Sequence, residues 1–460
     1  MNFGNVLSIR SFRDLWLGQL ISQLGDSFYY VAFMFMVKKL TGSDEMVGYV
    51  AAMETLPFLL FGPYSGVVAD RFDRRNVMLW SDIISGAVLV AMAMMFLLKV
   101  PPAPWLLMAL AFTLSSIRSF FLPAKTAAIP MLVPPAQTLN ANALSTATQN
   151  MAPLAGLALS AGAMSLLYNA APEQFYTIVM AVNASSFFLS AVFIALLPRL
   201  VPDHIAKAEA PPRSRPLHEF MEGFRYVRTR RDLTVLILLL AIFRLTVAPF
   251  FVVYVAANEK WFDGQPSNLA IWEMSFFLGM IGGSALAAKF PPKRPGLNFA
   301  LCLSVVGITV GLMGVLPNYW AFILCNVAAG LAVPPADVPI NTYMQLSVPD
   351  QFRGRTSSVL AMIATGVMPL GAVMGGTLIK WIGIGGTFLA MGLGMMAACA
   401  IGVIDPHFRN IRMPDVEPAE PTPASGDDSA NMSECPPHAL ASTKAEKVTT
   451  SAPSSSPHAT

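Results

Sequence analysis

Charged side chains are scarce in this chain of 460 residues. Asp, Glu, Lys and Arg together make up 12% of it, compared with about 25% in an average soluble domain. Hydrophobic residues make up 55%. This balance is typical of a protein whose main solvent is lipid. The net charge of +3 is small and scattered through loops, so we expect no nucleic-acid partner.

Cysteine and histidine are also few, and the usual catalytic and metal-binding motifs are missing. The four cysteines show no CxxC or Cys/His spacing, which argues against a zinc site and a disulfide framework. The sequence has no GxxxxGKS/T loop, GxSxG elbow or HExxH helix, and its five histidines form no catalytic set. We therefore expect neither an enzyme nor an ATP-driven pump, and no cofactor or metal.

Apolar segments of about the length that crosses a membrane recur from Leu15 to Ile404. Breaking them at proline, glycine and charged clusters predicts an all-α membrane protein with about twelve transmembrane helices. The expected helices span 15–38, 47–69, 77–98, 104–125, 139–168, 174–197, 233–257, 268–290, 297–316, 319–346, 355–382 and 384–404.

The order of these segments predicts two six-helix bundles, residues 1–197 and 233–404. Residues 198–232 between them form a polar cytoplasmic linker rich in arginine. Apolar residues within 217–227 recur at helical spacing, which fits an interfacial helix on the membrane or a solvated helix packed on the helix ends equally well. The segment 405–460 is rich in Pro, Ser, Ala and Thr and is expected to be a disordered cytoplasmic tail.

The lysines and arginines of the loops gather on one side of the membrane. That side includes the linker, the loop within 62–78 and Lys125 at the predicted end of the fourth helix. The opposite side holds only Lys38, Lys39, Lys99, Lys260 and Lys380. Because cytoplasmic loops carry the excess of Lys and Arg, both termini are expected to be cytoplasmic.

Two segments of the chain resemble each other. LPAKTAAIPMLVP at 122–134 and PPADVPINTYMQLSVP at 334–349 align so that Pro123 corresponds to Pro335. This similarity places the fourth and fifth helices in the same positions as the tenth and eleventh. Internal repeats of this kind are typical of transporter folds.

A charged motif, GPYSGVVADRFDRRNVM at 62–78, joins the second and third expected helices. Its key residues are a glycine, an aspartate and three arginines: Gly66, Asp70, Arg71, Arg74 and Arg75. The glycine permits close helix approach, the aspartate suits a helix N-terminus and the arginines suit carboxylates at helix ends. We interpret the motif as a conformational latch that favours one arrangement of the two bundles. A plain positively charged loop is the alternative.

The motif resembles the G-x-x-x-D-R-x-x-R-R signature of the major facilitator superfamily. Three further segments are similar to its secretion-type branch, which includes macrolide efflux proteins and enterobactin-type siderophore exporters. They are FRDLWLGQLISQLGDSFYYVA at 12–32, FLPAKTAAIPMLVP at 121–134 and VPDQFRGRTSSVLAM at 348–362.

The resemblance implies a major facilitator fold and a secondary active transporter in a bacterial inner (plasma) membrane. It implies a proton-coupled antiporter that exports small amphipathic molecules of the drug, macrolide or siderophore class by alternating access. Its expected partners are a small-molecule substrate, protons and the lipid bilayer, and the chain is expected to be a monomer. A lysophospholipid flippase or an uptake symporter of the same fold remains open. A channel or membrane receptor fits least, because it needs neither coupling acids nor the repeat.

Charges inside the expected helices are the candidates for coupling, because a charge at mid-bilayer costs about 2.5–3.5 kcal/mol. Asp26, Glu54 and Asp337 are the candidate proton-coupling acids, and a structural hydrogen bond to a neighbouring helix is the alternative for Asp26. Asp337 suits an ion pair with either Arg118 or Arg244. For Glu273, a structural or snorkelling role and a role in coupling both remain open. The substrate-cavity candidates are polar or charged residues on helix faces: Gln19, Gln23, Tyr30, Arg118, Asn142, Gln149, Arg244 and Asn341.

Overall fold

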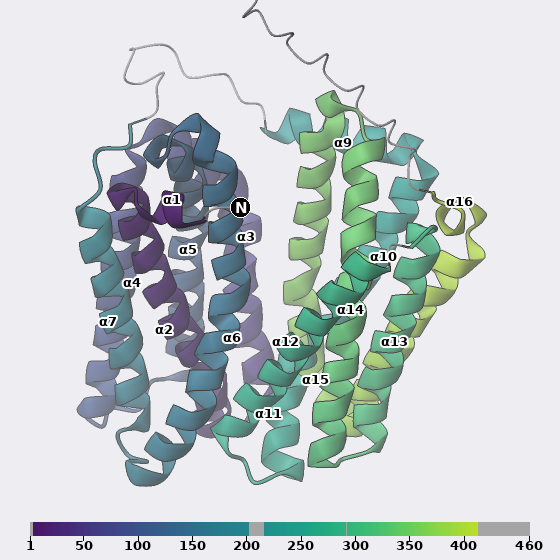
Figure 1. The fold of residues 1–460 in the computed structure, drawn as a ribbon. Helices are drawn as coiled ribbons and strands as arrows, with labels where there is room; N and C mark the ends of the chain where they lie inside the picture. The colour runs from purple at the N-terminus through teal and green to yellow at the C-terminus, as the bar shows by residue number, and fades with distance from the viewer. Residues whose placement is uncertain (1–2, 202–215, 291, 413–460) are drawn as a thin grey trace, which may run out of the picture. The chain divides into compact units, whose positions relative to one another are not determined.

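The computed structural model describes residues 3–201, 216–290 and 292–412, which are helical and, within these ranges, contain no strand. The helices are α1 Phe3–Leu7, α2 Arg10–Thr41, α3 Asp44–Arg71, α4 Arg74–Leu97, α5 Pro104–Leu132, η1 Pro135–Gln137, α6 Thr138–Ala170, α7 Phe175–Ala195, α9 Pro216–Thr229, α10 Arg231–Val247, α11 Phe250–Trp261, α12 Pro266–Lys289, α13 Pro295–Val315, α14 Tyr319–Ser347, α15 Asp350–Ile404 and α16 Pro406–Arg409 (Figure 1). Most of the expected tail and part of the expected linker lie outside the described residues.

The helices long and apolar enough to cross a membrane confirm the predicted all-α membrane fold. Within the described ranges there are ten, or eleven when the bent pair Asp44–Gly62 and Tyr64–Arg71 is one span. One of them, Met362–Ile404, has 43 residues, although about 20 suffice for a crossing. Its backbone leaves the helical conformation at Gly383, with φ 72° and ψ 177°. Counting its two parts separately adds one span to the eleven and gives the predicted twelve.

Local signals set the helix ends close to the predicted residues. The Ser43 side chain accepts a hydrogen bond from the Met46 N–H and starts α3, while Asp73 and Asn318 cap α4 and α14 in the same way. Gly42 adopts the left-handed conformation that ends α2, with φ 65°, which glycine takes at little cost. These caps explain why the predicted boundaries hold to within a few residues for most spans.

Two helices differ from the predicted ranges. The fourth was expected to end at residue 125, but α5 continues through Pro123 and Pro130 to Leu132. The seventh was expected as one helix over 233–257, but Ala248 and Pro249 separate α10 from α11. Proline is tolerated inside membrane helices, where neighbouring helices re-satisfy the freed backbone groups, so it is a weaker stop signal here than in a soluble protein.

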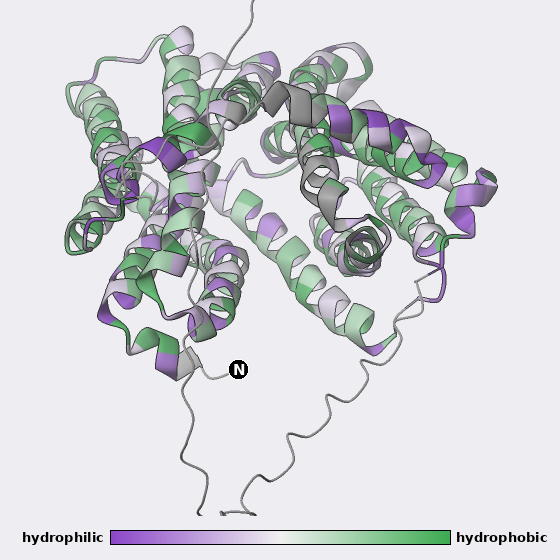
Figure 2. Cartoon of the chain, turned by 90° about the horizontal axis from the view of Figure 1, so that it is seen from above, coloured by the Kyte–Doolittle hydropathy of each residue, from purple (hydrophilic) through white to green (hydrophobic). Residues whose placement is uncertain are grey.

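The long helices run side by side, so the helix bundle has two opposite ends (Figure 1). We call the end where α10 begins the linker end and the end where α2 finishes the far end. Helices α2 to α7 pack mainly on one another, as do α10 to α15, and the pairs α3/α15 and α6/α12 join the two sets. Much of the helical ribbon in Figure 2 has the green colour of hydrophobic residues. The division into domains 1–197, 198–232, 233–404 and 405–460 stays a prediction.

Helices α3 and α15 approach each other closely at the far end through two glycines. A Cβ atom on Gly48 would lie 2.6 Å from the carbonyl oxygen of Ala372, and one on Gly376 would lie 2.6 Å from the Cα of Glu45. Small residues of this kind let membrane helices bring their backbones into contact. The contact joins the two sets of helices where the far end closes.

The orientation is testable with reporter fusions. A reporter fused after Asp405 is expected to be cytoplasmic, and one inserted between Phe262 and Pro266 is expected to be external, because Lys and Arg gather at the linker end. Green fluorescent protein and alkaline phosphatase report the two sides with opposite signals. Alkaline phosphatase activity after Asp405 would reverse the predicted orientation.

Candidate functional site

A cavity of about 540 Å³ lies among helices α2, α3, α4, α5, α6, α7 and α12. Its walls combine titratable side chains with phenylalanine and leucine. The aromatic part of the wall includes Phe58, Phe121, Phe187 and Phe277. A cavity with an apolar wall and a few convergent polar groups has the features of a small-molecule site.

Four acids from four helices line this cavity: Asp26 on α2, Glu54 on α3, Asp82 on α4 and Glu273 on α12. Asp26 accepts a hydrogen bond from Asn183 Nδ2 at 3.4 Å, and its Oδ2 lies 4.0 Å from Arg118 Nη1. Asp82 is 2% exposed, and the Ser190 hydroxyl group of α7 is its polar neighbour. Acids inside a membrane protein mark proton or ion pathways. In the described part of the chain, no group of three or more His, Cys, Asp or Glu side chains is arranged to hold a metal ion.

Two basic residues of α5, Arg118 and Lys125, line the same cavity. The Arg118 side chain is 58% exposed, whereas Lys125 is 3% exposed. Lys125 was assigned to the cytoplasmic loop, and that assignment is wrong because α5 continues for seven residues beyond it. The cavity therefore has both acids and bases on its walls.

The predicted face of the first helix lies in the cavity wall. Gln19, Gln23, Asp26 and Tyr30 all line the cavity, as their helical spacing on one side of α2 suggested. Of the other candidates, Glu54, Arg118 and Gln149 also line it. Their roles in coupling and binding stay predictions.

The candidates on the second half of the chain and on the start of α6 lie elsewhere. Asn142, Arg244, Asp337 and Asn341 are not among the residues that line the cavity. Asn142 and Asn341 are exposed. Arg244 interacts electrostatically with Asp337, which is one of the two pairings that the sequence left open. The structure gathers the other candidates and does not bring these four to them.

Three charged residues of the cavity were not assigned to it from the sequence. Asp82 could have been identified, since it is a charge inside the expected helix 77–98 and the argument used for Asp26 applies to it equally. Lys125 was missed because the expected helix ended at it and it was counted with the loop residues. Glu273 was left open between a structural or snorkelling role and coupling, and it reaches the cavity because α12 packs against α6.

A group of ion pairs closes the far end, and we call it the far-end network. It consists of Lys38, Lys39, Asp44, Glu259 and Lys260. Lys38 Nζ is 2.5 Å from Asp44 Oδ1 and 3.4 Å from Glu259 Oε2, and Lys260 Nζ is 3.6 Å from Asp44 Oδ2. The Lys38 side chain is 5% exposed. The network joins α2, α3 and α11, and Lys380 of α15 adds a pair to Glu45 at 3.1 Å.

The arginines of the latch motif bind backbone carbonyl groups at the linker end. Arg74 donates to Ala127 O at 3.1 Å in the last turns of α5. Arg75 donates to Ile194 O at 3.3 Å and to Ala195 O at 2.6 Å, where α7 ends. Cations at helix C-termini satisfy the free carbonyls and the helix dipole. The sequence had suggested carboxylate partners, and the carboxylate of Asp70 is 3.8 Å from Arg74 but 61% exposed.

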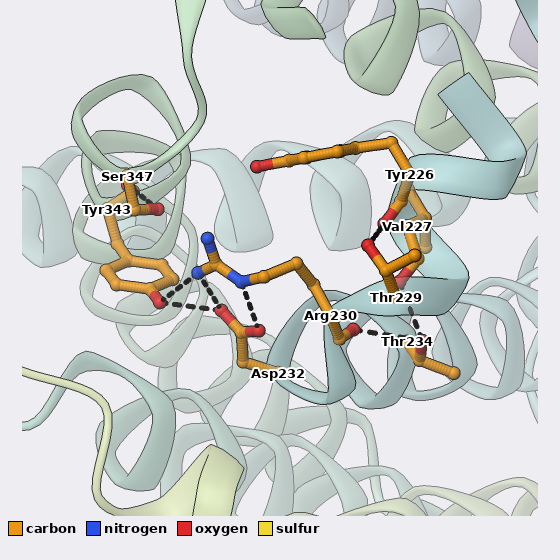
Figure 3. Close-up of polar contacts among 8 residues, drawn as sticks. All are labelled: Tyr226, Val227, Thr229, Arg230, Asp232, Thr234, Tyr343 and Ser347. Atoms are coloured by element: carbon orange, nitrogen blue, oxygen red, sulfur yellow. Dashed lines mark hydrogen bonds and ion pairs between the residues drawn. The ribbon is translucent and has the colours of Figure 1, made fainter. Parts of the chain in front are cut away.

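A second polar cluster holds α9 and α10 to α14 at the linker end (Figure 3). Arg230 donates to both oxygens of Asp232, at 3.0 and 2.7 Å, and the Tyr343 hydroxyl donates to Asp232 Oδ2 at 2.6 Å. Tyr226 of α9 stacks on Phe352 of α15, with ring centroids 4.5 Å apart. The bidentate geometry is the strong form of an arginine–carboxylate pair. The linker helix is therefore fixed to the second half of the chain.

Asp405 joins α10 to α16 at the linker end. It accepts hydrogen bonds from the His407 and Phe408 N–H groups at 3.0 Å and from Arg231 Nε at 2.9 Å. Burial by itself raises the pKa of Asp405, but these hydrogen bonds outweigh it and hold the pKa below its ordinary value. The carboxylate thus stays charged and keeps α10 joined to α16.

Mutations of the latch residues are expected to have two different effects, slower transport or lower stability. Asp70→Asn and Arg71→Ala should leave the protein in the membrane and slow transport, because both side chains are exposed and are proposed to act in another bundle arrangement. Arg75→Ala should instead lower stability by about 0.5–1.5 kcal/mol, because the carbonyl groups of Ile194 and Ala195 at the end of α7 lose their donor. Transport rate and thermal midpoint at equal protein level separate the two effects.

Arg409→Ala is the matched control, since Arg409 is exposed at the same end and lies outside the motif. It should change neither readout. Near-normal transport by both Asp70→Asn and Arg71→Ala would refute the latch.

Comparison with known proteins agrees with this geometry. The family model of transmembrane secretion effectors matches residues 5–429. Macrolide efflux protein A of Streptococcus pyogenes is 26% identical over 414 residues, which are 88% of this chain and 98% of that protein. Multidrug efflux pump Tap of Mycolicibacterium fortuitum is 26% identical over 408 residues, which are 85% of this chain and 95% of that protein.

Solved structures share the fold. The match to the nucleoside transporter NupG has a TM-score of 0.63 at 11% identity and covers 85% of this chain and 98% of that one. The match to a bacterial homologue of the iron transporter ferroportin in an inward-facing state has a TM-score of 0.62 at 16% identity and covers 86% of this chain and 98% of that one. With a family match over most of its length and a transporter fold of about twelve spans, the chain belongs to the transmembrane secretion effector family and is a membrane transporter of the major facilitator type.

Proposed function

We propose that the protein is a proton-coupled exporter of small amphipathic molecules, of the drug, macrolide or siderophore class, that works by alternating access. The observation that carries this proposal is the cavity, where four acids face an aromatic and aliphatic wall. An amphipathic molecule needs the apolar wall, and exchange against protons needs acids that gain and lose a proton in the same space. The efflux relatives, at 26% identity, support export.

The far-end network supports alternating access. It closes the cavity's far side in the conformation described, and its charges would face water if α2, α3 and α11 separated there. Ion pairs that form in one conformation and are hydrated in the other bias a two-state equilibrium without binding substrate. In the proposed orientation this conformation is the one that loads substrate from the cytoplasm.

The proposal is tested in inside-out vesicles that contain the purified wild-type chain. A proton gradient, acid inside, is imposed and followed with a pH-sensitive acridine dye, and erythromycin or ethidium is then added outside. Proton-coupled export predicts that the added compound accumulates inside while protons leave, so the gradient partly collapses. Accumulation that requires a sodium gradient would overturn proton coupling, and accumulation that requires the opposite proton gradient would overturn export.

A further inference from the structure

Lys125 is a buried cation that the transport mechanism above does not use. It lies on α5, is 3% exposed and lines the cavity. Among the residues that the structure describes, none forms a hydrogen bond or ion pair with it. Removing one charge from water without a partner costs several kcal/mol, and a lysine at such a site is therefore in need of an anion.

The nearest cation shares its helix face. Arg118 and Lys125 are seven residues apart, which is two turns, or about 10 Å along the helix axis. Phe121 and Leu122 lie between them and also line the cavity. One stripe of α5 thus presents two positive groups with an apolar surface between them.

The acids of the cavity leave both cations available. Asp26 approaches Arg118 at 4.0 Å, the outer limit of an ion pair, and Glu54 also interacts electrostatically with Arg118, yet the Arg118 side chain is 58% exposed. Glu54, Asp82 and Glu273 stand on α3, α4 and α12 and make no ion pair with Lys125. A guanidinium with free N–H groups and a lysine ammonium are the usual donors to carboxylate and phosphate oxygens.

We propose that Lys125 and Arg118 form an anion subsite that binds a carboxylate or phosphate group of an amphipathic substrate. The apolar part of the substrate lies against Phe121 and the aromatic wall. The inference rests on the proposed function insofar as it takes the cavity to be the substrate site. Within the proposed substrate range it favours amphiphiles that carry a negative group.

Binding of single-tailed probes tests the subsite. The wild-type chain is placed in nanodiscs of phosphatidylcholine, and affinities for radiolabelled octanoate, octyl phosphate and octyltrimethylammonium are measured by scintillation proximity. The Lys125→Met variant should lower the affinity for both anions relative to the cation by about tenfold or more, since it removes a charged hydrogen bond. Lys125→Arg should restore most of the preference, and Lys99→Met, an exposed lysine paired with Glu173, should leave the affinities unchanged.

Comparison of the probes also identifies which anionic group the subsite binds. Preference for octyl phosphate over octanoate indicates a phosphate headgroup, the reverse indicates a carboxylate, and binding of inorganic phosphate alone shows that the subsite needs no apolar tail. Equal anion preference in Lys125→Met and the wild type overturns the proposal. An export failure in the vesicle assay leaves this binding readout intact, so the two proposals fail separately.

A second measurement needs no variant and covers the case in which Lys125→Met does not fold. Acetic anhydride labels accessible lysines of the wild-type chain, and mass spectrometry reports the rate at Lys125. Octanoate should slow labelling of Lys125 and leave Lys99 unaffected, whereas octyltrimethylammonium should protect Lys125 less. Labelling of Lys125 that octanoate does not slow overturns the subsite.

Discussion

Asp26→Asn is expected to abolish uphill transport while substrate exchange continues. Asp26 lies between a cation and an amide, with Arg118 at 4.0 Å and Asn183 Nδ2 donating to it at 3.4 Å. Asparagine keeps the size of the side chain and the oxygen that accepts from Asn183. It removes the charge and the proton-binding group, so a transporter that depends on Asp26 loses its coupling and keeps its fold.

The measurement is efflux or uptake in vesicles with an imposed pH gradient, at equal protein level. The accumulation ratio should fall to about one, as binding without coupling permits only equilibration, and counterflow of labelled against unlabelled substrate should persist. Asp263→Asn is the control, since Asp263 is exposed in the loop before α12, and it should behave like the parent. If Asp26→Asn still concentrates substrate with the parent's pH dependence, Asp26 has a packing role instead.

Lys38→Met is expected to open the far end and to destabilise the closed conformation. The side chain is 5% exposed, and its Nζ is 2.5 Å from Asp44 and 3.4 Å from Glu259. Methionine leaves two carboxylates facing each other with only the more exposed Lys39 and Lys260 near them. Loss of one partner from a buried pair costs about 3–5 kcal/mol. A free-energy change of this size is enough to make the open conformation the more populated of the two.

A cysteine placed at Ser27, in the cavity wall, reports the opening in a cysteine-free background. Its labelling by a membrane-impermeant reagent from the far side should speed up in Lys38→Met, and the thermal midpoint should fall. Lys99→Met is the matched control, because Lys99 and Glu173 pair at 3.2 Å with both side chains 81% exposed, and such pairs contribute about 0–1 kcal/mol. Unchanged labelling and unchanged stability in Lys38→Met would show that the network does not hold this end closed.

The fold was predictable because its main signal is repeated in every span. Apolar length predicted the helices, and caps such as Ser43 and Asp73 kept their ends near the expected residues. The exceptions depend on tertiary context. Pro130 would end a helix in water, yet α5 continues through it where other helices surround it. The backbone turn at Gly383 was predicted only because glycine interrupts two apolar runs.

The site was predictable only on the first half of the chain. The face of α2 that carries Gln19, Gln23 and Asp26 follows from helical spacing alone, and it lines the cavity. Which other helices complete that cavity depends on how they tilt and cross, and a single sequence carries no such distance. Arg244 and Asp337 were therefore placed with the first-half residues by their charge, whereas the structure puts them outside the cavity lining.

The glycine contact between α3 and α15 has a consequence for turnover. At Gly48 and Gly376 backbone meets backbone, so at these two points, unlike at the neighbouring Glu45–Lys380 pair, no long side chain has to leave or regain a rotamer when the helices part. Ordering a long side chain costs up to about 2 kcal/mol of conformational entropy, and this surface avoids that cost in each cycle. The speed of opening then depends on hydrating the neighbouring charges, and a methyl group at either glycine would act as a wedge that shortens the lifetime of the closed form.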